Sequence, residues 1–294
     1  MSGTELLQAI VDGILTGGVY ALMAAGLTLI FGVMDIINIA QGVMVVLGAY
    51  LSYALSVHLH LDLFLGLLIT IPAMFVIGVI IQVAFIRPLH GSERTSMSLL
   101  ASYAVAIVIE GALYLFFGPN YVTLNASYVS SSFGLLGFQL PYIDVYGFAM
   151  AVVLVAALYW LLYRTTFGRS VRATMQDRTA ALLIGVDVNR VAALTYGIGV
   201  AVTAAGGMIF GASGGGFNPN SGYDLISRLL AIIILAGLGS IGGALIASVL
   251  MLTVESVVDI WQPNWSVAVF YAALVIVLLV RPTGLFGRQA ARAQ

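Results

Sequence analysis

Residues 63–86 read LFLGLLITIPAMFVIGVIIQVAFI and contain no charged side chain. A helix needs about 20 consecutive apolar residues to cross the hydrocarbon core of a bilayer, so this stretch is long enough to span it. Comparable apolar runs follow one another along the chain. They predict spans near residues 6–31, 36–57, 63–86, 96–117, 142–163, 191–210, 222–237, 241–258 and 265–281. The predicted fold is an all-α polytopic membrane protein with about eight or nine transmembrane segments.

The composition excludes several classes of protein. Of the 294 residues, 61% are apolar and 8% are charged, whereas about a quarter of the residues of a soluble domain are charged. The eleven basic residues are all arginine, so the chain has neither a Walker A phosphate loop nor a lysine for Schiff-base chemistry. Cysteine is absent, which removes disulfides and thiol chemistry. We predict no catalytic residue, cofactor or metal site, and the net charge of −1 gives no reason to expect nucleic-acid binding.

Ten of the eleven arginines fall in three connections between the predicted spans. They are Arg87 and Arg94, then Arg164, Arg169, Arg172, Arg178 and Arg190, and finally Arg281, Arg288 and Arg292. Basic connections resist translocation, so these three are predicted to be cytoplasmic and the arginine-free connections to lie outside. Cytoplasmic and outer connections alternate along the chain, and this order requires an odd number of membrane crossings. We therefore expect the N-terminus outside, and the C-terminus and loop 164–190 in the cytoplasm.

Two glycine-flanked breaks interrupt the apolar pattern. Residues 32–42 read GVMDIINIAQG, and residues 237–243 read GLGSIGG. Each joins a segment predicted to run inward to one predicted to run outward, which is compatible with a parallel internal repeat, although the two sequences are only weakly similar. Paired breaks at membrane depth point to a transport site, because non-helical backbone there must be buried in protein or line a cavity. The alternative is that both are tight cytoplasmic turns.

Three side chains of the fourth predicted span share one helical face. Tyr103 lies seven residues before Glu110, and Tyr114 lies four residues after it. A carboxyl group near the middle of a bilayer costs about 2.5–3.5 kcal/mol to insert, so it is expected to face a cavity or a partner. These residues either line a substrate pathway or make a structural contact with a neighbouring helix.

Asn38 and Gln41 begin a second polar stripe along the second predicted span. Such a stripe suits either a wet translocation path or a tight helix contact, and its start at the first break favours the path. Gly199, Thr203 and Gly207, which are spaced four residues apart, predict a seam of close helix packing instead.

The loop at residues 164–190 reads RTTFGRSVRATMQDRTAALLIGVDVNR. From about Val171 to Ile184 it has no glycine or proline, which predicts one short amphipathic helix under the membrane. Residues 179–185, TAALLIG, resemble the EAAxxxG core of the coupling loop of binding-protein-dependent ABC importers, with threonine in place of glutamate. The alternative is a solvated loop that only fixes the orientation.

Several motifs, in order along the chain, resemble the permeases of the high-affinity branched-chain amino acid importers, the LivH type. They include GVYAL at 18–22, GLTLIFG at 26–32, INIAQG at 37–42, LGAY at 47–50, GLGSIGGA at 237–244 and RPTGLFG at 281–287. Pieces of the arginine-rich loop are similar to the same family. The resemblance covers nearly the whole chain.

This resemblance implies one transmembrane permease domain over residues 1–294, with a coupling loop at 164–190, in the cytoplasmic (inner) membrane of a prokaryote. The partners it implies are a second homologous permease or a second copy of this chain, two cytoplasmic ATPase subunits, an extracytoplasmic substrate-binding protein and membrane lipid. ATP hydrolysis belongs to the ATPases, and this chain is expected not to be an enzyme. The expected solute is a branched-chain or related amino acid, with urea, short amides or aromatic carboxylates as alternatives within the family.

The residues that the resemblance assigns to ATPase contact are Asp177, Thr179, Ala180, Ala181 and Gly185, with Arg169 and Arg172 supporting the same face. The family carries glutamine or glutamate at the place of Glu110, so the resemblance asks for no charge there. A competing interpretation is a stand-alone ion-coupled secondary transporter or channel that uses Glu110 as its coupling carboxylate. The arginine-bearing loop argues against it, since a self-sufficient carrier needs no coupling surface.

Overall fold

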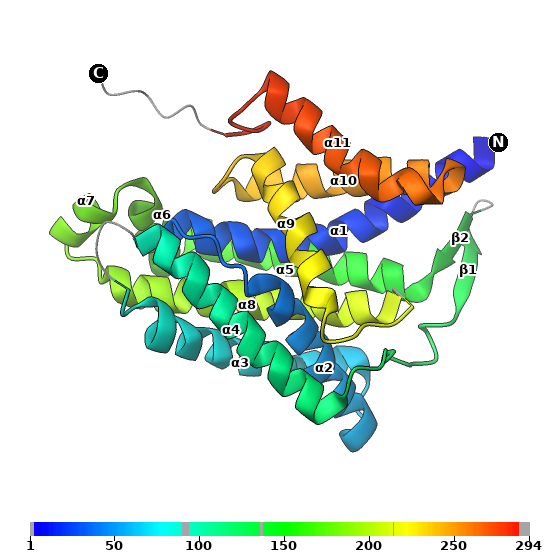
Figure 1. Cartoon of the computed structure of the whole chain (residues 1–294), viewed down its shortest axis with the longest axis horizontal. Coiled ribbons are helices and arrows are strands. Elements are labelled where there is room, and N and C mark those ends of the chain that lie inside the picture. The colour runs from blue at the N-terminus through cyan, green and yellow to red at the C-terminus, as the bar shows by residue number, and fades with distance from the viewer. Residues whose placement is uncertain (1–2, 90–93, 136–137, 214, 288–294) are drawn as a thin grey trace.

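The computed structural model describes residues 3–89, 94–135, 138–213 and 215–287, which form a bundle of helices (Figure 1). Eight helices within these ranges are long and apolar enough to cross a membrane. They are α1 (Gly3–Met34), α2 (Gln41–Leu59), α3 (Leu63–Ile81) with its π-helical continuation η1 (Gln82–Ile86), α4 (Arg94–Phe117), α5 (Tyr142–Arg164), α8 (Val188–Ser213), α10 (Ile241–Trp261) and α11 (Pro263–Val280). The predicted all-α polytopic fold is confirmed.

Shorter elements mark the two ends of the bundle. One end carries α6 (Thr166–Gln176) and α7 (Arg178–Leu183), and we call it the α7 end. At the opposite end, β1 (Ser132–Leu135) and β2 (Phe138–Pro141) form an antiparallel hairpin, and we call this the hairpin end (Figure 1).

One predicted span, residues 222–237, is a short helix. α9 (Ser221–Ala236) has 16 residues and is about 24 Å long, less than the thickness of the hydrocarbon core. Phe217, just before it, pairs with Val122 in the loop that follows α4, and Leu238, just after it, lines a cavity at the α7 end.

α1 and α8 form the centre of the bundle. In each, 78% of the apolar window is buried inside the protein, against 22% for α4 and α5. The two helices approach closely because glycines face each other: a Cβ atom on Gly26 would lie 2.4 Å from the Gly199 carbonyl oxygen. Gly207 similarly packs on the backbone of Val45 in α2. This confirms the predicted seam on α8, since helices in lipid associate by close backbone approach.

The first break differs from the prediction that the second span starts at residue 36. α2 begins at Gln41, and residues 35–40 run as non-helical backbone within the protein. This is tolerated because the segment is largely buried and hydrogen-bonded. The amide of Ile39, for example, donates to the Ser102 hydroxyl at 3.2 Å. Asn38 therefore lies in the break and is not on the helical face that begins with Gln41.

The second break is a glycine turn that the C-terminal segment closes. Gly237 ends α9 with a φ of 95°. Residues 281–287 return from α11 to this turn, where the Leu285 amide donates to the Leu235 carbonyl oxygen at 2.7 Å, and the next amide bonds to the next carbonyl oxygen at 3.0 Å. Only glycine fits at position 284, since a Cβ there would lie 2.6 Å from the Gly237 nitrogen. The segment thus satisfies carbonyl groups that a helix end leaves open.

The arginine-rich loop contains two helices where one was predicted from Val171 to Ile184. α6 ends at Gln176 and α7 begins at Arg178, and the backbone between them is extended. The boundary falls at Asp177 because its carboxylate caps the start of α7, and an N-cap residue has non-helical backbone angles. The prediction of a single helix is wrong for this reason.

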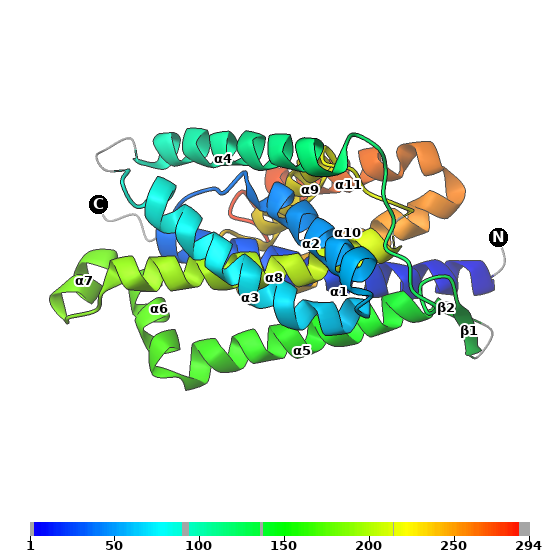
Figure 2. The same ribbon diagram turned by 90° about the horizontal axis from the view of Figure 1, so that it is seen from below.

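The predicted cytoplasmic connections gather at the α7 end. Arg87, after η1, lines a small hollow together with Asn189 at the start of α8. Figure 2 shows α4 and α8 beginning at the same end as α6 and α7. Arg228 in α9 lies within the bundle instead, where it forms an ion pair of 2.7 Å with Glu255 in α10.

Candidate functional site

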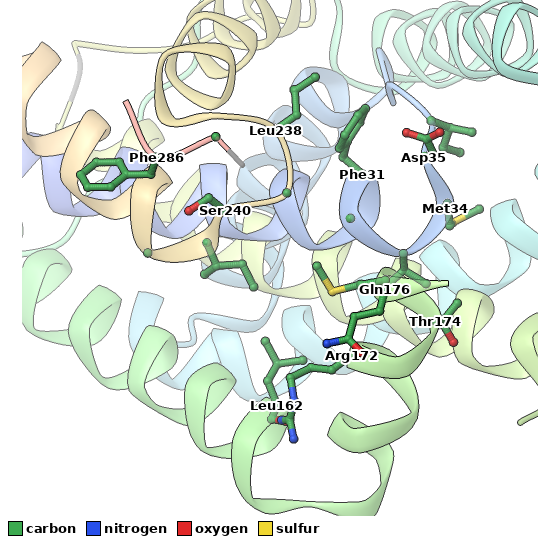
Figure 3. A pocket seen from close by; sticks show the side chains of 18 of the residues that line it. Phe31, Met34, Asp35, Leu162, Arg172, Thr174, Gln176, Leu238, Ser240 and Phe286 are labelled. Atoms are coloured by element: carbon green, nitrogen blue, oxygen red, sulfur yellow. The ribbon is translucent and has the colours of Figure 1, made fainter. Parts of the chain in front are cut away.

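A cavity of about 1390 Å³ opens at the α7 end (Figure 3). Its wall combines the end of α1 with Asp35, α6 with Arg172, the second break with Ser240, and the C-terminal turn with Phe286. Asp35 ends α1 in a left-handed conformation, with a φ of 54°, which side chains other than glycine rarely adopt. The two breaks therefore border one cavity, beside the predicted coupling loop.

α7 carries most of the residues predicted to contact an ATPase. The Asp177 carboxylate accepts hydrogen bonds from the amides of Thr179 at 2.8 Å and Ala180 at 3.0 Å. Gly185 follows the helix with a φ of 85°, a typical glycine C-cap. These four residues are exposed, whereas Ala181 is 1% exposed. Ala181 therefore packs α7 against the rest of the protein and is not available for contact with another subunit.

Sequence reasoning missed the apolar tip of α7. Leu182, Leu183 and Ile184 are 54%, 83% and 75% exposed. Clustered exposed apolar side chains mark a contact with another protein or with a membrane. The signal in the sequence is three consecutive apolar residues before a glycine. That these residues are exposed could not be predicted, because it depends on α7 being a separate helix that ends at Leu183.

Arg169 and Arg172 lie on α6 in different surroundings. Arg172 donates a hydrogen bond to the Leu162 carbonyl oxygen, and its guanidinium carbon lies 4.9 Å from the centre of the Tyr163 ring. These contacts hold α6 against the end of α5. Arg169 is exposed. Of the two, Arg169 is the more exposed, and Arg172 positions the helix.

Asn38 and Gln41 form a buried hydrogen-bond network that fixes the first break. Both are 0% exposed, and the Asn38 amide donates to Gln41 Oε1 at 2.9 Å. The Gln41 amide in turn donates to the Thr203 hydroxyl at 2.5 Å and to the Gly199 carbonyl oxygen at 3.4 Å. The network ties the break to the packing seam of α8, which matches the tight-contact alternative for this stripe.

Glu110 belongs to α4 and lies at a more open place, where its side chain contacts α9. The Tyr223 hydroxyl of α9 donates to its carboxylate at 2.7 Å. Tyr103 and Tyr114, on the same face of α4, are 44% and 37% exposed. Tyr223 was not predicted, because only the structure brings the start of α9 to this point of α4.

At the hairpin end, Asp62 ties the start of α3 to the loop before β1. Its carboxylate accepts hydrogen bonds from the Phe64 amide at 2.9 Å and the Tyr128 hydroxyl at 2.7 Å. Burial, and then the hydrogen bond to Asp62, raise the pKa of Tyr128 above its usual value. Within the described ranges, no group of three or more His, Asp or Glu side chains is arranged to hold a metal ion.

Comparison with known families adds to this geometry. The family model of the branched-chain amino acid transport system permease component matches residues 9–278. The chain belongs to this permease family. The match includes both breaks, all of α6 and α7, and the Glu110 region of α4.

Curated relatives of this permease family match the chain over almost its full length. It is 28% identical to the high-affinity branched-chain amino acid transport system permease protein BraD of Pseudomonas aeruginosa, over 96% of each chain. It is likewise 28% identical to LivH of Escherichia coli over 96% of each chain. A probable LivH from Methanocaldococcus jannaschii is 25% identical over 95% of this permease and 92% of the relative. No solved structure matches.

Proposed function

We propose that this chain is the transmembrane permease subunit of an ATP-driven, binding-protein-dependent importer for branched-chain or related amino acids. The carrying observation is the family match over residues 9–278, with full-length relatives named as branched-chain amino acid permeases. The whole chain acts as one permease domain. Its partners are a second permease subunit or a second copy of itself, two ATPases that hydrolyse ATP, and an extracytoplasmic binding protein.

The α7 end is the cytoplasmic side in this proposal, and the N-terminus lies outside. Support comes from the gathering of the arginine-bearing connections at this end, since basic connections stay in the cytoplasm. The hairpin end then faces the binding protein.

α7 is the proposed coupling surface. Asp177 and Gly185 define its two ends, Thr179 and Ala180 lie on its exposed side, and Arg169 adds a cation nearby. The exposed apolar tip, residues 182–184, supplies the contact that can be buried in a groove of an ATPase. Arg172 and Ala181 act by holding α6 and α7 in place.

The proposed passage runs along the flank of α4 and α9, where Glu110, Tyr103 and Tyr114 lie. Asn38 and Gln41 contribute to it indirectly, by fixing the shape of the first break. The cavity at the α7 end lies between the coupling loop and α9, because its wall includes both α6 and the break that follows α9.

Co-purification with the ATPases tests the coupling assignment. Deletion of residues 177–185 is expected to abolish capture of ATPase subunits co-expressed with the chain, and Leu183→Asp to weaken it strongly. Asn189→Ala, an exposed change at the start of α8, is the matched control and should retain capture. All variants should remain monodisperse in detergent. Retention of the ATPases and of uptake by the deletion variant would show that α7 is not the coupling surface.

The stand-alone carrier is separated from this proposal by its energy source. An ATP-driven importer keeps amino acid uptake when a protonophore collapses the proton gradient while ATP is maintained. A proton-coupled carrier that uses Glu110 loses uptake under the same condition. Loss of wild-type uptake would reject the ATP-driven proposal.

A further inference from the structure

Four tyrosines from three helices surround the Glu110 region. Tyr103 and Tyr114 lie on the same face of α4 as Glu110, and the Tyr223 hydroxyl of α9 donates to the Glu110 carboxylate at 2.7 Å. Tyr50 of α2 packs against α4 through the ring of Phe117, which lies three residues after Tyr114. We call Tyr50, Tyr103, Glu110, Tyr114 and Tyr223 the tyrosine cage.

The Tyr50 hydroxyl is an unexplained group in this cage. Its side chain is 0% exposed and is held by ring contacts to Phe117 at 4.5 Å and Phe217 at 4.9 Å between centroids. The hydroxyl has no hydrogen-bond partner in the described protein. Buried polar groups normally have a partner, so this hydroxyl leaves a hydrogen-bonding group that a polar ligand or water would satisfy.

The flank that carries the cage also has polar side chains at its surface. Asp224 and Ser227 of α9 are exposed, and Glu110 is only half-buried. α4 and α9 lie on the same side of the bundle in both views (Figures 1 and 2). Charged groups at membrane depth face a water-filled path or a partner, not lipid. The cage therefore opens toward the proposed passage.

The chemistry of the cage selects for a cation. Glu110 provides a negative charge, and the partly exposed rings of Tyr103 and Tyr114 provide the electron-rich faces that attract ammonium groups. The nearest arginine along α9, Arg228, is engaged with Glu255. An anionic solute would instead be repelled by the Glu110 carboxylate.

We propose that the tyrosine cage binds the ammonium group of the solute during its passage, an assignment that rests on the proposed transport function. It makes an amine-bearing solute the substrate class and disfavours aromatic carboxylates.

Direct binding to the full chain in lipid nanodiscs tests the cage without requiring transport. The probes are isopentylammonium, isovalerate and isopentanol, which share a branched alkyl group and differ in charge. Calorimetry, with empty nanodiscs subtracted, should show binding of isopentylammonium only. Absence of that binding, or equal binding of isovalerate, would overturn the cage. Failure of uptake with intact ammonium binding would instead count against the proposed transport function.

Paired variants distinguish ring faces from hydroxyl groups. Glu110→Gln should raise the Kd of isopentylammonium by roughly tenfold or more, and Tyr103→Leu or Tyr114→Leu by roughly two- to fivefold. Tyr103→Phe and Tyr114→Phe keep the ring and should raise the Kd less than the leucine variants do. Tyr121→Phe, at an exposed tyrosine outside the cage, should bind as the wild type does. Equal losses in the Phe and Leu variants would overturn the ring contribution. An unchanged Kd in Glu110→Gln would overturn the cage itself.

Discussion

The ion pair between Arg228 and Glu255 should be one of the strongest single links between two helices of this protein. Their charged atoms are 2.7 Å apart, and the two side chains are 23% and 13% exposed. The Arg228 guanidinium also lies 5.6 Å from the centre of the Phe270 ring in α11. The pair therefore connects α9 to two later helices.

Removal of one partner leaves the other charge unpaired in a largely buried site, which typically costs about 3–5 kcal/mol. Arg228→Gln and Glu255→Gln should each lower the free energy of unfolding by this amount, or roughly two to three and a half orders of magnitude in the folded-to-unfolded ratio. The double variant Arg228→Leu/Glu255→Leu removes both charges, so it should be less destabilised than either single variant.

Unfolding by SDS in mixed micelles measures these differences, with far-ultraviolet circular dichroism as the readout. Asp259→Asn, an exposed carboxylate on α10, is the control and should change stability by less than about 0.5 kcal/mol. The reasoning is refuted if the single variants lose less than about 1 kcal/mol, or if the double variant loses the sum of the two.

Three further predictions follow from single positions. Asp177→Ala removes the cap of α7 and should cost that helix about 1 kcal/mol, seen as roughly fivefold faster amide exchange at residues 179–185 with unchanged exchange in α8. Gly284→Ala should expose the turn after α9 to proteolysis, because its φ of 79° is strained for alanine and the new Cβ would overlap Gly237, whereas Gly111→Ala meets open space and should be silent. Tyr128 has a folded pKa above its ordinary value of 10.0, so its stabilising contribution is complete below that pH and is lost as the pH rises through the folded pKa. The melting temperature of the wild type should therefore fall as the pH rises from about 10 to 12, and that of Tyr128→Phe should fall less. An equal fall in both proteins would show that Tyr128 is not the source of the pH dependence.

Most of the fold could be predicted because long apolar runs have few alternatives in a membrane. The runs at 63–86 and 241–258, for example, correspond to α3 with η1 and to α10. The first break could be located from INIAQG, but the point at which α2 starts could not. That point depends on Gln41 bonding to α8, a partner far away in the sequence.

The candidate sites were predictable to different degrees. The coupling loop could be predicted from its arginines and from TAALLIG. Its division into two helices could not, because it depends on the Asp177 carboxylate capping the start of α7. The face of Glu110 followed from helical spacing alone. Tyr223 and Tyr50 could not be assigned to it, because helix packing, and not spacing, brings α9 and α2 to α4.

The closure of α9 by residues 281–287 has a consequence for biosynthesis. The last carbonyl groups of this helix receive their partners from Leu285 and Phe286, which leave the ribosome after α10 and α11. Until then, α9 is a short helix with an unfinished end, and the cavity beside it lacks one wall. A chain truncated before Pro282 would therefore be expected to insert its helices yet leave the end of α9 without these partners.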